Sequence, residues 1–380
     1  MFFEIFLSSV LSITWKQVLM YMVSCFLIWL AIKKEYEPTL LLPMGFGTIL
    51  VNLPFSGVLN QILPGIGETH GIVEWLFEVG IGASEALPIL LFIGIGAMID
   101  FGPLLARPYL FLPGMAAQVG IIIALLIALF CGFDIKDAAS IGIIGASDGP
   151  TAILVSQILG SKYVGAIAVA AYSYMALVPV IQPAVIRLTT TKKERAVCMS
   201  NTQKNVSGRV KIIFPIAVTF VVGLLAPASA GLVGFLMFGN LLKECGVLER
   251  LAGAARNELT NLITLLLGLT ISFRMQAEDF VKPDTLMILL IGLLAFVFDT
   301  VGGILAVRLI NLFMKEKLNP MIGAAGISAF PMSSRVVQKL ALEENPHNIL
   351  IMHAVGANVS GQIASGIVGG MLIQVIASWG

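Results

Sequence analysis

The segment Ile141–Gly160, IGIIGASDGPTAILVSQILG, is the most informative part of this chain, because a related segment occurs later in it. Shifted by 181 positions, it aligns without gaps on Ile322–Ala341, IGAAGISAFPMSSRVVQKLA, and eight of the twenty positions are identical. Both copies are hydrophobic, and both are interrupted by Gly or Pro. Interrupted hydrophobic segments at matching places in two halves of a membrane protein indicate a transport site.

The two copies differ in charge. The first carries an acid, Asp148, and the second carries a base, Arg335. A charge in a segment at hydrocarbon depth is energetically expensive and usually functional. We therefore expect this chain to move something charged across a membrane, and we expect the interrupted helices to hold the site.

The composition predicts a membrane protein. Apolar residues make up 58% of the chain and charged residues 12%, against about 45–50% and 25% in soluble proteins. Apolar spans of nearly membrane length recur, for example Trp15–Ile32, Tyr109–Cys131 and Met287–Leu305. The fold class that we predict is an all-α polytopic membrane protein with two repeats, which we expect to be inverted in topology. It should be embedded as a multi-pass protein in the lipid bilayer of the inner (plasma) membrane of the cell.

Other classes of function find little support. The four cysteines and three histidines are scattered without the spacing of metal ligands. Most charges lie in loops between spans, so the net charge of +1 gives no reason to expect a nucleic-acid partner. No polar stretch is long enough to fold as a soluble catalytic domain.

The chain divides into three parts by this interpretation. Repeat one covers residues 1–187, with its broken helix near 141–160, and repeat two covers 212–380, with its broken helix near 319–341. The loop 188–211 between them is basic: Arg187–Lys211 holds seven Lys or Arg and one Glu. The positive-inside rule places this loop in the cytoplasm. It could be a topological signal alone, or also a docking surface for a cytoplasmic partner.

Each interruption should expose backbone groups. Pro150 lacks an N–H and pushes Gly149 towards an extended conformation. We therefore expect a helix that ends near Ser147, unwound backbone at Asp148-Gly149, and a new helix from Pro150. Phe330-Pro331 should interrupt the second copy in the same way. Exposed carbonyls can bind a cation, and an exposed helix N-terminus can bind an anion.

Asp148 is the main candidate ligand. It should lie beside free carbonyls and the hydroxyls of Ser147 and Thr151, which together form an oxygen site suited to a hard ion such as Na⁺. The alternative is that Asp148 only caps the second half-helix, because Asp is a favoured N-cap residue.

Arg335 is the main candidate for binding an anion, because its guanidinium keeps its charge and binds carboxylates through two hydrogen bonds. The alternative is a salt bridge to Asp148, which would account for both charges without a substrate.

Further polar residues are weaker candidates. Tyr172 and Tyr174 could pack as aromatics or relay a proton. Asp299 lies near the end of a span and is expected to be interfacial. Three residues of the C-terminal span could line the same cavity or hold helices together: Asn358, Ser360 and Gln362.

Four motifs resemble a known family: IGIIGASDGPTAI, GIGAMIDFGPLLARP, FDTVGG and NPMIGAAGISAFPMSSR. They are similar to motifs of the membrane-integral β subunit of the biotin-dependent sodium-pumping decarboxylases, which include the oxaloacetate, methylmalonyl-CoA and glutaconyl-CoA enzymes. The resemblance runs from about Tyr21 to the end of the chain. It implies that a partner delivers carboxybiotin, and that the β subunit decarboxylates it, consumes a proton from outside and exports Na⁺ from the cytoplasm.

The resemblance also implies roles for individual residues. Asp148, Asn319 and Ser328 would bind Na⁺. Tyr174 and Ser328 would serve the proton path, and Arg335 would face carboxybiotin, which makes these three the catalytic candidates. Gly323, placed with Arg335 at the cofactor, would allow close backbone approach.

The partners implied are a biotinylated carrier or carboxyltransferase subunit, a small membrane anchor subunit, and further copies of this chain within the complex. The chain contains no Met-Lys-Met biotin acceptor, so biotin would come from a partner. Two other interpretations stay open. A stand-alone Na⁺-coupled transporter of organic anions would bind its substrate at Arg335 and would not co-purify with a biotinylated protein. A membrane anchor would have no site of its own.

A labelling experiment tests the predicted topology. A cysteine at Thr202, in a variant without the four native cysteines, should react with an impermeant maleimide only in inside-out vesicles. The reason is that the basic loop should face the cytoplasm. Labelling from the outside of intact cells would contradict this orientation.

Overall fold

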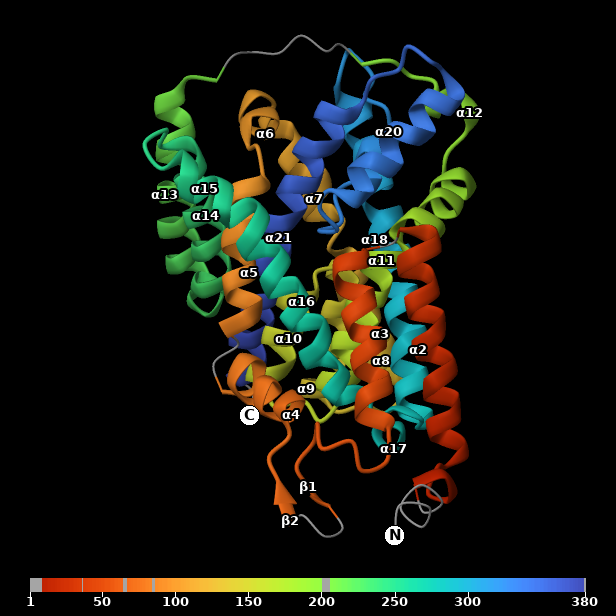
Figure 1. Ribbon diagram of the computed structural model, residues 1–380. Coiled ribbons are helices and arrows are strands. Elements are labelled where there is room, and N and C mark those ends of the chain that lie inside the picture. The colour runs from red at the N-terminus through yellow and green to blue at the C-terminus, as the bar shows by residue number, and fades with distance from the viewer. Residues whose placement is uncertain (1–8, 36, 64–66, 84–85, 200–205, 379–380) are drawn as a thin grey trace. The chain divides into compact units, whose positions relative to one another are not determined.

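The computed structural model describes residues 9–35, 37–63, 67–83, 86–199 and 206–378 (Figure 1). Helices dominate it, and this confirms the predicted all-α class. Two short antiparallel strands, β1 (Gln61–Leu63) and β2 (Gly67–Thr69), pair with Gln61 opposite Thr69. Thr202, the labelling position above, lies outside the described residues.

Seven helices of the described part are long and apolar enough to cross a membrane, which confirms a multi-pass membrane protein. They are Trp15–Lys34, Pro108–Phe130, Val164–Thr189, Gly208–Leu225, Glu249–Met275, Pro283–Phe313 and Ile351–Ala377.

The described chain forms two compact units, residues 1–91 with 258–287 and residues 92–257 with 288–380. Unit 1 draws on both predicted repeats, so the division into repeats stays a prediction. The elements of unit 1 are the hairpin, α2 (Trp15–Lys34), α3 (Pro38–Asn52), α4 (Ile72–Phe77), η1 (Glu78–Gly82), α16 (Thr260–Ile271), η6 (Ser272–Met275) and α17 (Ala277–Phe280). Three helices run through the division: α5 (Ala86–Met98), η5 (Ala255–Leu259) and α18 (Pro283–Phe313).

Small residues hold unit 1 together. A Cβ on Gly45 of α3 would lie 2.9 Å from Ile28 of α2, and a Cβ on Gly268 of α16 would lie 2.8 Å from the carbonyl oxygen of Leu40. Glycine therefore lets α2, α3 and α16 approach closely, as small residues do between membrane helices.

Unit 2 contains both interrupted segments and the helices around them. Before the basic loop its elements are α6 (Gly102–Ala106), η2 (Pro108–Leu110), α7 (Phe111–Ala116), α8 (Val119–Phe130), α9 (Ile135–Gly142), η3 (Ile143–Ala146), α10 (Gly149–Ile158), α11 (Val164–Thr189) and α12 (Lys192–Arg195). After the loop they are α13 (Gly208–Leu225), η4 (Pro227–Ser229), α14 (Ala230–Glu244), α15 (Glu249–Ala254), α19 (Met321–Ala324), α20 (Met332–Glu344) and α21 (Ile351–Ala377).

Both segments are interrupted where the sequence predicts. In the first, η3 ends at Ala146 and α10 begins at Gly149, one residue before the predicted start at Pro150. Ser147 between them has a left-handed backbone, with φ 54°. In the second, α19 ends at Ala324 and α20 begins at Met332. We call these two breaks, residues 147–148 and 325–331, the first gap and the second gap. Each gap leaves backbone groups that must find hydrogen-bond partners inside the protein.

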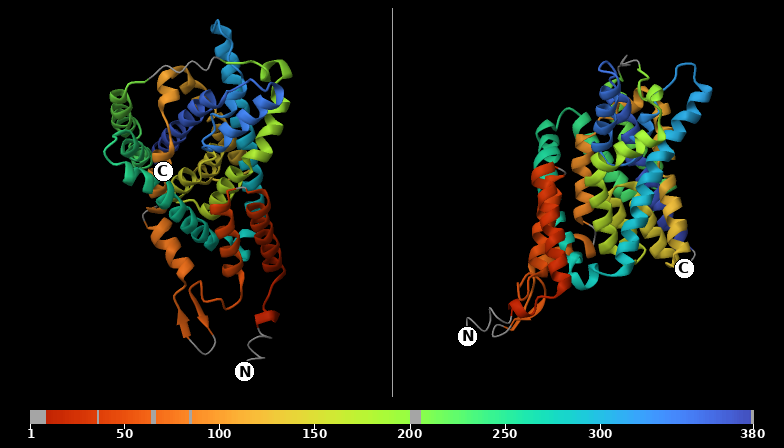
Figure 2. Two further views of the ribbon diagram at one scale, coloured as in Figure 1. Left: turned by 45° about the horizontal axis from the view of Figure 1, so that its top comes forward. Right: turned by 90° about the vertical axis from the view of Figure 1, so that its right-hand side faces the viewer.

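The interrupted segments are packed by glycines against two helices of unit 2. A Cβ on Gly142 would lie 2.8 Å from the carbonyl oxygen of Ile121 in α8, and one on Gly323 would lie 2.0 Å from that of Gly303 in α18. Figure 2 shows α8 (yellow) and α18 (light blue) from two further directions. Equivalent glycines of the two copies therefore both allow a close approach to a neighbouring helix, while the inverted-repeat arrangement stays a prediction.

The Gly323–Gly303 contact leads to a prediction about stability. The atom that a Cβ on Gly323 would meet is backbone and cannot rotate away, so Gly323→Ala should cost about 1–3 kcal/mol, as overpacking does. The control is Gly253→Ala in α15, where nothing lies within 4 Å. It should stabilise by about 0.5–1 kcal/mol, because Ala favours the helix. Thermal unfolding of the purified variants measures both, and equal melting temperatures would contradict the packing argument.

Candidate functional site

The two interruptions touch each other. The backbone N–H of Ser328, in the second gap, donates to the carbonyl oxygen of Ala146 at the first gap, at 3.1 Å. Ala146 precedes Ser147, which is the residue equivalent to Ser328 in the sequence alignment. Unwound backbone from both segments therefore meets at one place, and the polar site is built around it.

Asp148 is buried at this meeting point, with only 3% of its surface exposed. Its backbone is extended, and it occupies the N-cap position of α10. Thr151 donates its hydroxyl to Oδ2 of Asp148 at 2.6 Å, and Ser365 of α21 donates at 3.4 Å. No described lysine, arginine or histidine forms an ion pair with it. Two hydroxyl oxygens thus contact its carboxylate, whereas the hydroxyl of Ser147 donates to the carbonyl oxygen of Gly145 at 3.2 Å. That this site binds a hard cation stays a prediction.

Ser328, whose backbone contacts Ala146, is also buried. Its hydroxyl donates to the carbonyl oxygen of Gly361 at 3.0 Å, and its own carbonyl accepts a hydrogen bond from the side chain of Gln362. The side chain of Asn358 donates to the carbonyl oxygen of Ile327 at 2.6 Å. Asn358 and Gln362 of α21 thus satisfy the carbonyls of the second gap.

The other polar residues of α21 divide between the two roles that the sequence left open. Ser365 faces Asp148, so it lines the site. Ser360 instead donates to the carbonyl oxygen of Leu110 at 2.9 Å and joins α21 to η2. Sequence reasoning named Ser360 but did not single out Ser365, whose role depends on the register of α21 against α10.

Two tyrosines of α11 lie at different places. The ring of Tyr172 packs on Gly149, where an added Cβ would be 2.3 Å from the ring. Gly149 directly follows Asp148, and the buried hydroxyl of Tyr172 has no hydrogen-bond partner in the described part of the chain. Tyr174, the predicted proton carrier, donates its hydroxyl to the carbonyl oxygen of Leu289 in α18. Tyr172 is therefore the tyrosine that packs on the first gap.

Asn319 lies at the start of α19, with its amide fully engaged. Its nitrogen donates to the carbonyl oxygens of Arg195 and Val197, both at 2.9 Å, and its oxygen accepts from the backbone N–H of Met321 at 3.0 Å. Asn348 donates to the same two carbonyls at 3.1 Å. A sodium-binding role for Asn319 stays a prediction; the contacts formed here position the segment 190–198, which we call the α12 loop.

Arg335 lies in the first turn of α20, and its side chain is exposed. It forms no ion pair with any described carboxylate, so the alternative in which it pairs with Asp148 is wrong for this structure. The acid is buried and the base is accessible. Gly323, the other predicted cofactor residue, is buried against Gly303, and its part in binding a cofactor stays a prediction.

Asp299 corrects an expectation. The sequence suggested an interfacial position, but the side chain is 1% exposed and lies in the interior of α18. Its Oδ1 accepts from the backbone N–H of Gly120 at 2.6 Å. Its Oδ2 faces Gly145 of η3 and has no hydrogen-bond partner among the residues that the structure describes. The sequence pattern places Asp299 near the end of an apolar run, whereas α18 has 31 residues and continues past it, so the burial of Asp299 was not predicted.

The α12 loop is held by charge as well as by the two asparagines. Arg195 donates to Glu344 of α20 at 2.8 Å, and Arg308 of α18 donates to the two carboxylate oxygens of Glu194 at 2.7 and 2.9 Å. The hydrogen bond from Arg308 lowers the pKa of Glu194 to about 2. This loop, which continues from α11, therefore ties α11 to α18, α19 and α20.

Fold and site together define a helical membrane protein whose buried polar centre is formed by two interrupted helices. The sequence model of the family described as the Na⁺-transporting oxaloacetate decarboxylase β subunit matches residues 16–376. The chain belongs to this family.

Individual relatives agree with this assignment. The methylmalonyl-CoA decarboxylase subunit β of Propionigenium modestum is 45% identical, with 94% of each chain covered. The oxaloacetate decarboxylase β chain 2 of Salmonella typhi is 43% identical, with 95% of each covered. The glutaconyl-CoA decarboxylase subunit β of Acidaminococcus fermentans is also 43% identical, over 97% of this chain and 96% of the relative. The family predicted from the motifs is thus confirmed.

The pKa of Glu194 leads to a pH-dependent prediction. Because the folded pKa is depressed, the pair with Arg308 stabilises the protein above the ordinary pKa of about 4.5, and this contribution is lost as the pH falls towards 2. Glu194→Gln should lower the melting temperature at pH 7, and the difference from the parent protein should shrink between pH 5 and pH 3.

The matched control for this prediction is Glu343→Gln, which removes the exposed pair with Arg187. It should change the melting temperature little, because exposed pairs contribute little. A Glu194→Gln deficit that is independent of pH would show that the carboxylate charge does not hold the loop.

Proposed function

We propose that this chain is the membrane subunit of a sodium-pumping decarboxylase complex, in which it binds Na⁺ at the contact between its two gaps and decarboxylates carboxybiotin delivered by a partner. Membership of the family supports the coarse statement, a membrane-integral decarboxylase subunit. The single observation that supports the sodium site is Asp148. It is a carboxylate buried among oxygen atoms, and no described basic side chain pairs with it.

Na⁺ is the cargo in this proposal. The carboxylate of Asp148 supplies the counter-charge, and the hydroxyls of Thr151, Ser365 and Ser328 supply neutral oxygen ligands. A hydroxyl that now donates to Asp148 can turn its lone pairs towards a cation instead. A sodium ion at this depth requires such a counter-charge, because an uncompensated charge inside a membrane is energetically unfavourable. Asn319 would contribute by direct ligation or by fixing the start of α19.

Arg335 is the residue that we assign to carboxybiotin. It is exposed, its guanidinium forms no ion pair with a described residue, and it is suited to bind a carboxylate through two hydrogen bonds. Carboxybiotin supplies a carboxyl group on a ring nitrogen, which is lost readily as CO₂ once that nitrogen is protonated. Arg335 orients the carboxylate, and Gly323 permits close backbone approach nearby.

The proton reaches the site through hydroxyl groups of this chain. We propose Tyr174 and Ser328 for this path, and Tyr172 joins them because its ring packs on Gly149, which directly follows Asp148, and its hydroxyl is buried. A proton and Na⁺ compete for the Asp148 cluster, since either one neutralises the carboxylate. Protonation from outside would then release Na⁺, and this competition couples decarboxylation to export from the cytoplasm.

The complex requires partners. The relatives are named as chains or subunits of larger enzymes, which supports a multi-subunit assembly. We propose a biotinylated carrier or carboxyltransferase subunit, a small membrane anchor subunit and further copies of this chain. A stand-alone sodium-coupled transporter of organic anions is not favoured, because the relatives are named decarboxylases. Co-purification of a biotinylated protein, detected with avidin, separates the two.

Asp148→Asn tests the sodium site, because it keeps the shape of the side chain and removes the charge. Decarboxylation that depends on Na⁺ should be abolished, and Na⁺ should no longer raise the melting temperature of the purified complex. If Asp148 only caps α10, the free energy of unfolding should fall by less than about 2 kcal/mol, since Asn is also a good cap.

The matched control is Asp137→Asn. Asp137 is equally buried, at 3% exposure, and accepts a hydroxyl hydrogen bond from Ser161 at 2.7 Å, but it lies at the start of α9 beside Lys162. Asp137→Asn should keep both Na⁺ responses. If Asp148→Asn also keeps them, Asp148 is a cap and the sodium site lies elsewhere.

A further inference from the structure

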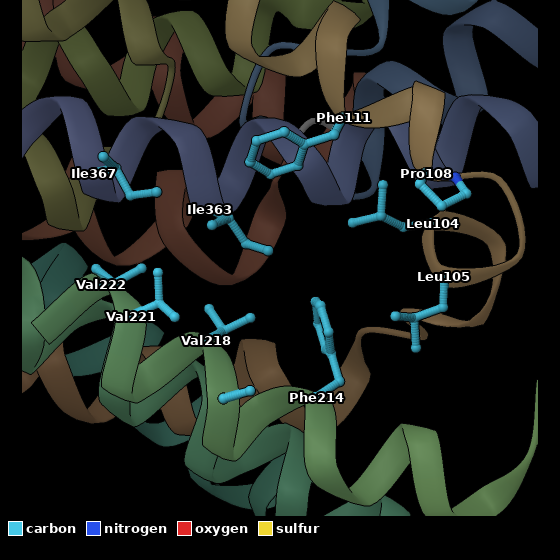
Figure 3. A pocket seen from close by; sticks show the side chains of 11 residues that line it. Leu104, Leu105, Pro108, Phe111, Phe214, Val218, Val221, Val222, Ile363 and Ile367 are labelled. Carbon is cyan, nitrogen blue, oxygen red and sulfur yellow. The ribbon is translucent and has the colours of Figure 1, made fainter. Parts of the chain in front are cut away.

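An apolar cavity of about 350 Å³ lies within unit 2, and none of the residues of the polar site lines it. Figure 3 shows its eleven lining side chains, which come from α6, η2, α7, α13 and α21 and are all hydrophobic. Its size falls in the range of ligand-binding pockets. No polar group in its lining could bind water or an ion, so a ligand must be hydrocarbon.

The helix that forms one wall of the cavity also faces outward. Phe214, Val218 and Val222 of α13 point into the cavity, whereas Phe220 on the same helix is 69% exposed. Apolar exposure of this kind on a predicted membrane-spanning helix places it at the hydrocarbon of the bilayer. Acyl chains are therefore the apolar groups available to this cavity at the highest concentration.

Two basic residues lie close in sequence to residues that line the cavity. Lys211 precedes Phe214 by three residues, so it lies on the cavity face of α13, and Arg107 directly precedes Pro108, which lines the cavity. The ammonium of Lys211 forms ion pairs with Asp100 at 3.5 Å and with Glu244 at 3.7 Å, so a lipid phosphate would compete with these carboxylates for it. Lys211 ends the basic loop, which we predict to be cytoplasmic, and basic pockets between helices on that side suit anionic lipid headgroups.

We propose that this cavity binds one acyl chain of an anionic phospholipid, whose phosphate lies at Lys211 and Arg107. The apolar lining selects the chain and the two basic residues select the headgroup. A zwitterionic lipid with the same chains should bind less well, because its headgroup carries no net negative charge for Lys211 and Arg107. The proposal does not depend on the chemistry that we assign to Asp148 or Arg335.

The cavity and the polar site share α21. Ile363 and Ile367 line the cavity, whereas Gln362 and Ser365 of the same helix contact Ser328 and Asp148. A bound acyl chain would therefore support the helix that satisfies the second gap. Occupancy should stabilise the folded protein whether or not Na⁺ is present.

Native mass spectrometry of the purified complex tests the proposal. The delipidated protein is supplied with dioleoyl phosphatidylglycerol or with dioleoyl phosphatidylcholine. Val218→Trp should fill the cavity and retain one phosphatidylglycerol fewer per chain than the parent protein. The matched control, Phe220→Trp, lies two residues away on the exposed face and should retain the same number as the parent.

Lys211→Gln tests the headgroup, with the exposed Lys315→Gln as its control. Only Lys211→Gln should remove the preference for phosphatidylglycerol over phosphatidylcholine. Ile363→Phe fills the cavity from the other wall and repeats the test if Val218→Trp is poorly folded. Equal lipid retention in Val218→Trp and Phe220→Trp would overturn the proposal. So would loss of a membrane subunit, rather than a lipid, from the Val218→Trp complex, since the cavity would then accept a helix.

Discussion

Unwound backbone at membrane depth is the constraint on which the rest of unit 2 depends. The bilayer offers no hydrogen-bond partners, so every carbonyl and N–H exposed at the two gaps must be satisfied by protein. The gaps satisfy each other through Ser328 and Ala146, and α21 completes the second gap with the side chains of Asn358 and Gln362. A polar cluster inside an apolar protein follows directly from these requirements.

Close packing is the second consequence, because the interrupted segments must lie near enough to α8 and α18 to exclude lipid. Gly142 and Gly323 provide that approach. The α12 loop adds a restraint outside the membrane, where Asn319 and Asn348 hold the same two carbonyls and Glu194 pairs with Arg308. The second interrupted segment is thus fixed to the loop that follows α11, the helix whose Tyr172 packs on the first gap.

Local residue chemistry made part of this site predictable. Gly149-Pro150 marked the first gap to within one residue, and Thr151 lies one helical turn from Asp148, so their contact follows from spacing alone. Contacts between distant segments were not predictable in this way. Ser365 reaches Asp148 only because α21 passes α10 in one register, and Asp299 is buried because α18 continues well past it. The side-chain amide of Asn319, a predicted sodium ligand, donates to the α12 loop, whose fold the sequence pattern did not indicate.

The separation of the two charges bears most on how such a protein can couple two processes. Arg335 is exposed and Asp148 is buried, yet α20 begins directly after the gap that contains Ser328. On the proposed function, Ser328 would contribute to the cation site at Asp148 and Arg335 would bind the substrate carboxylate, and both residues belong to the second interrupted segment. Because Ser333 of α20 shares a hydrogen bond with Asn358, a shift of α20 on substrate binding would change how α21 satisfies that gap. On the proposed function, coupling therefore requires no ion pair between Asp148 and Arg335. It requires only that the cation site and the substrate site be formed by the same arrangement of the backbone.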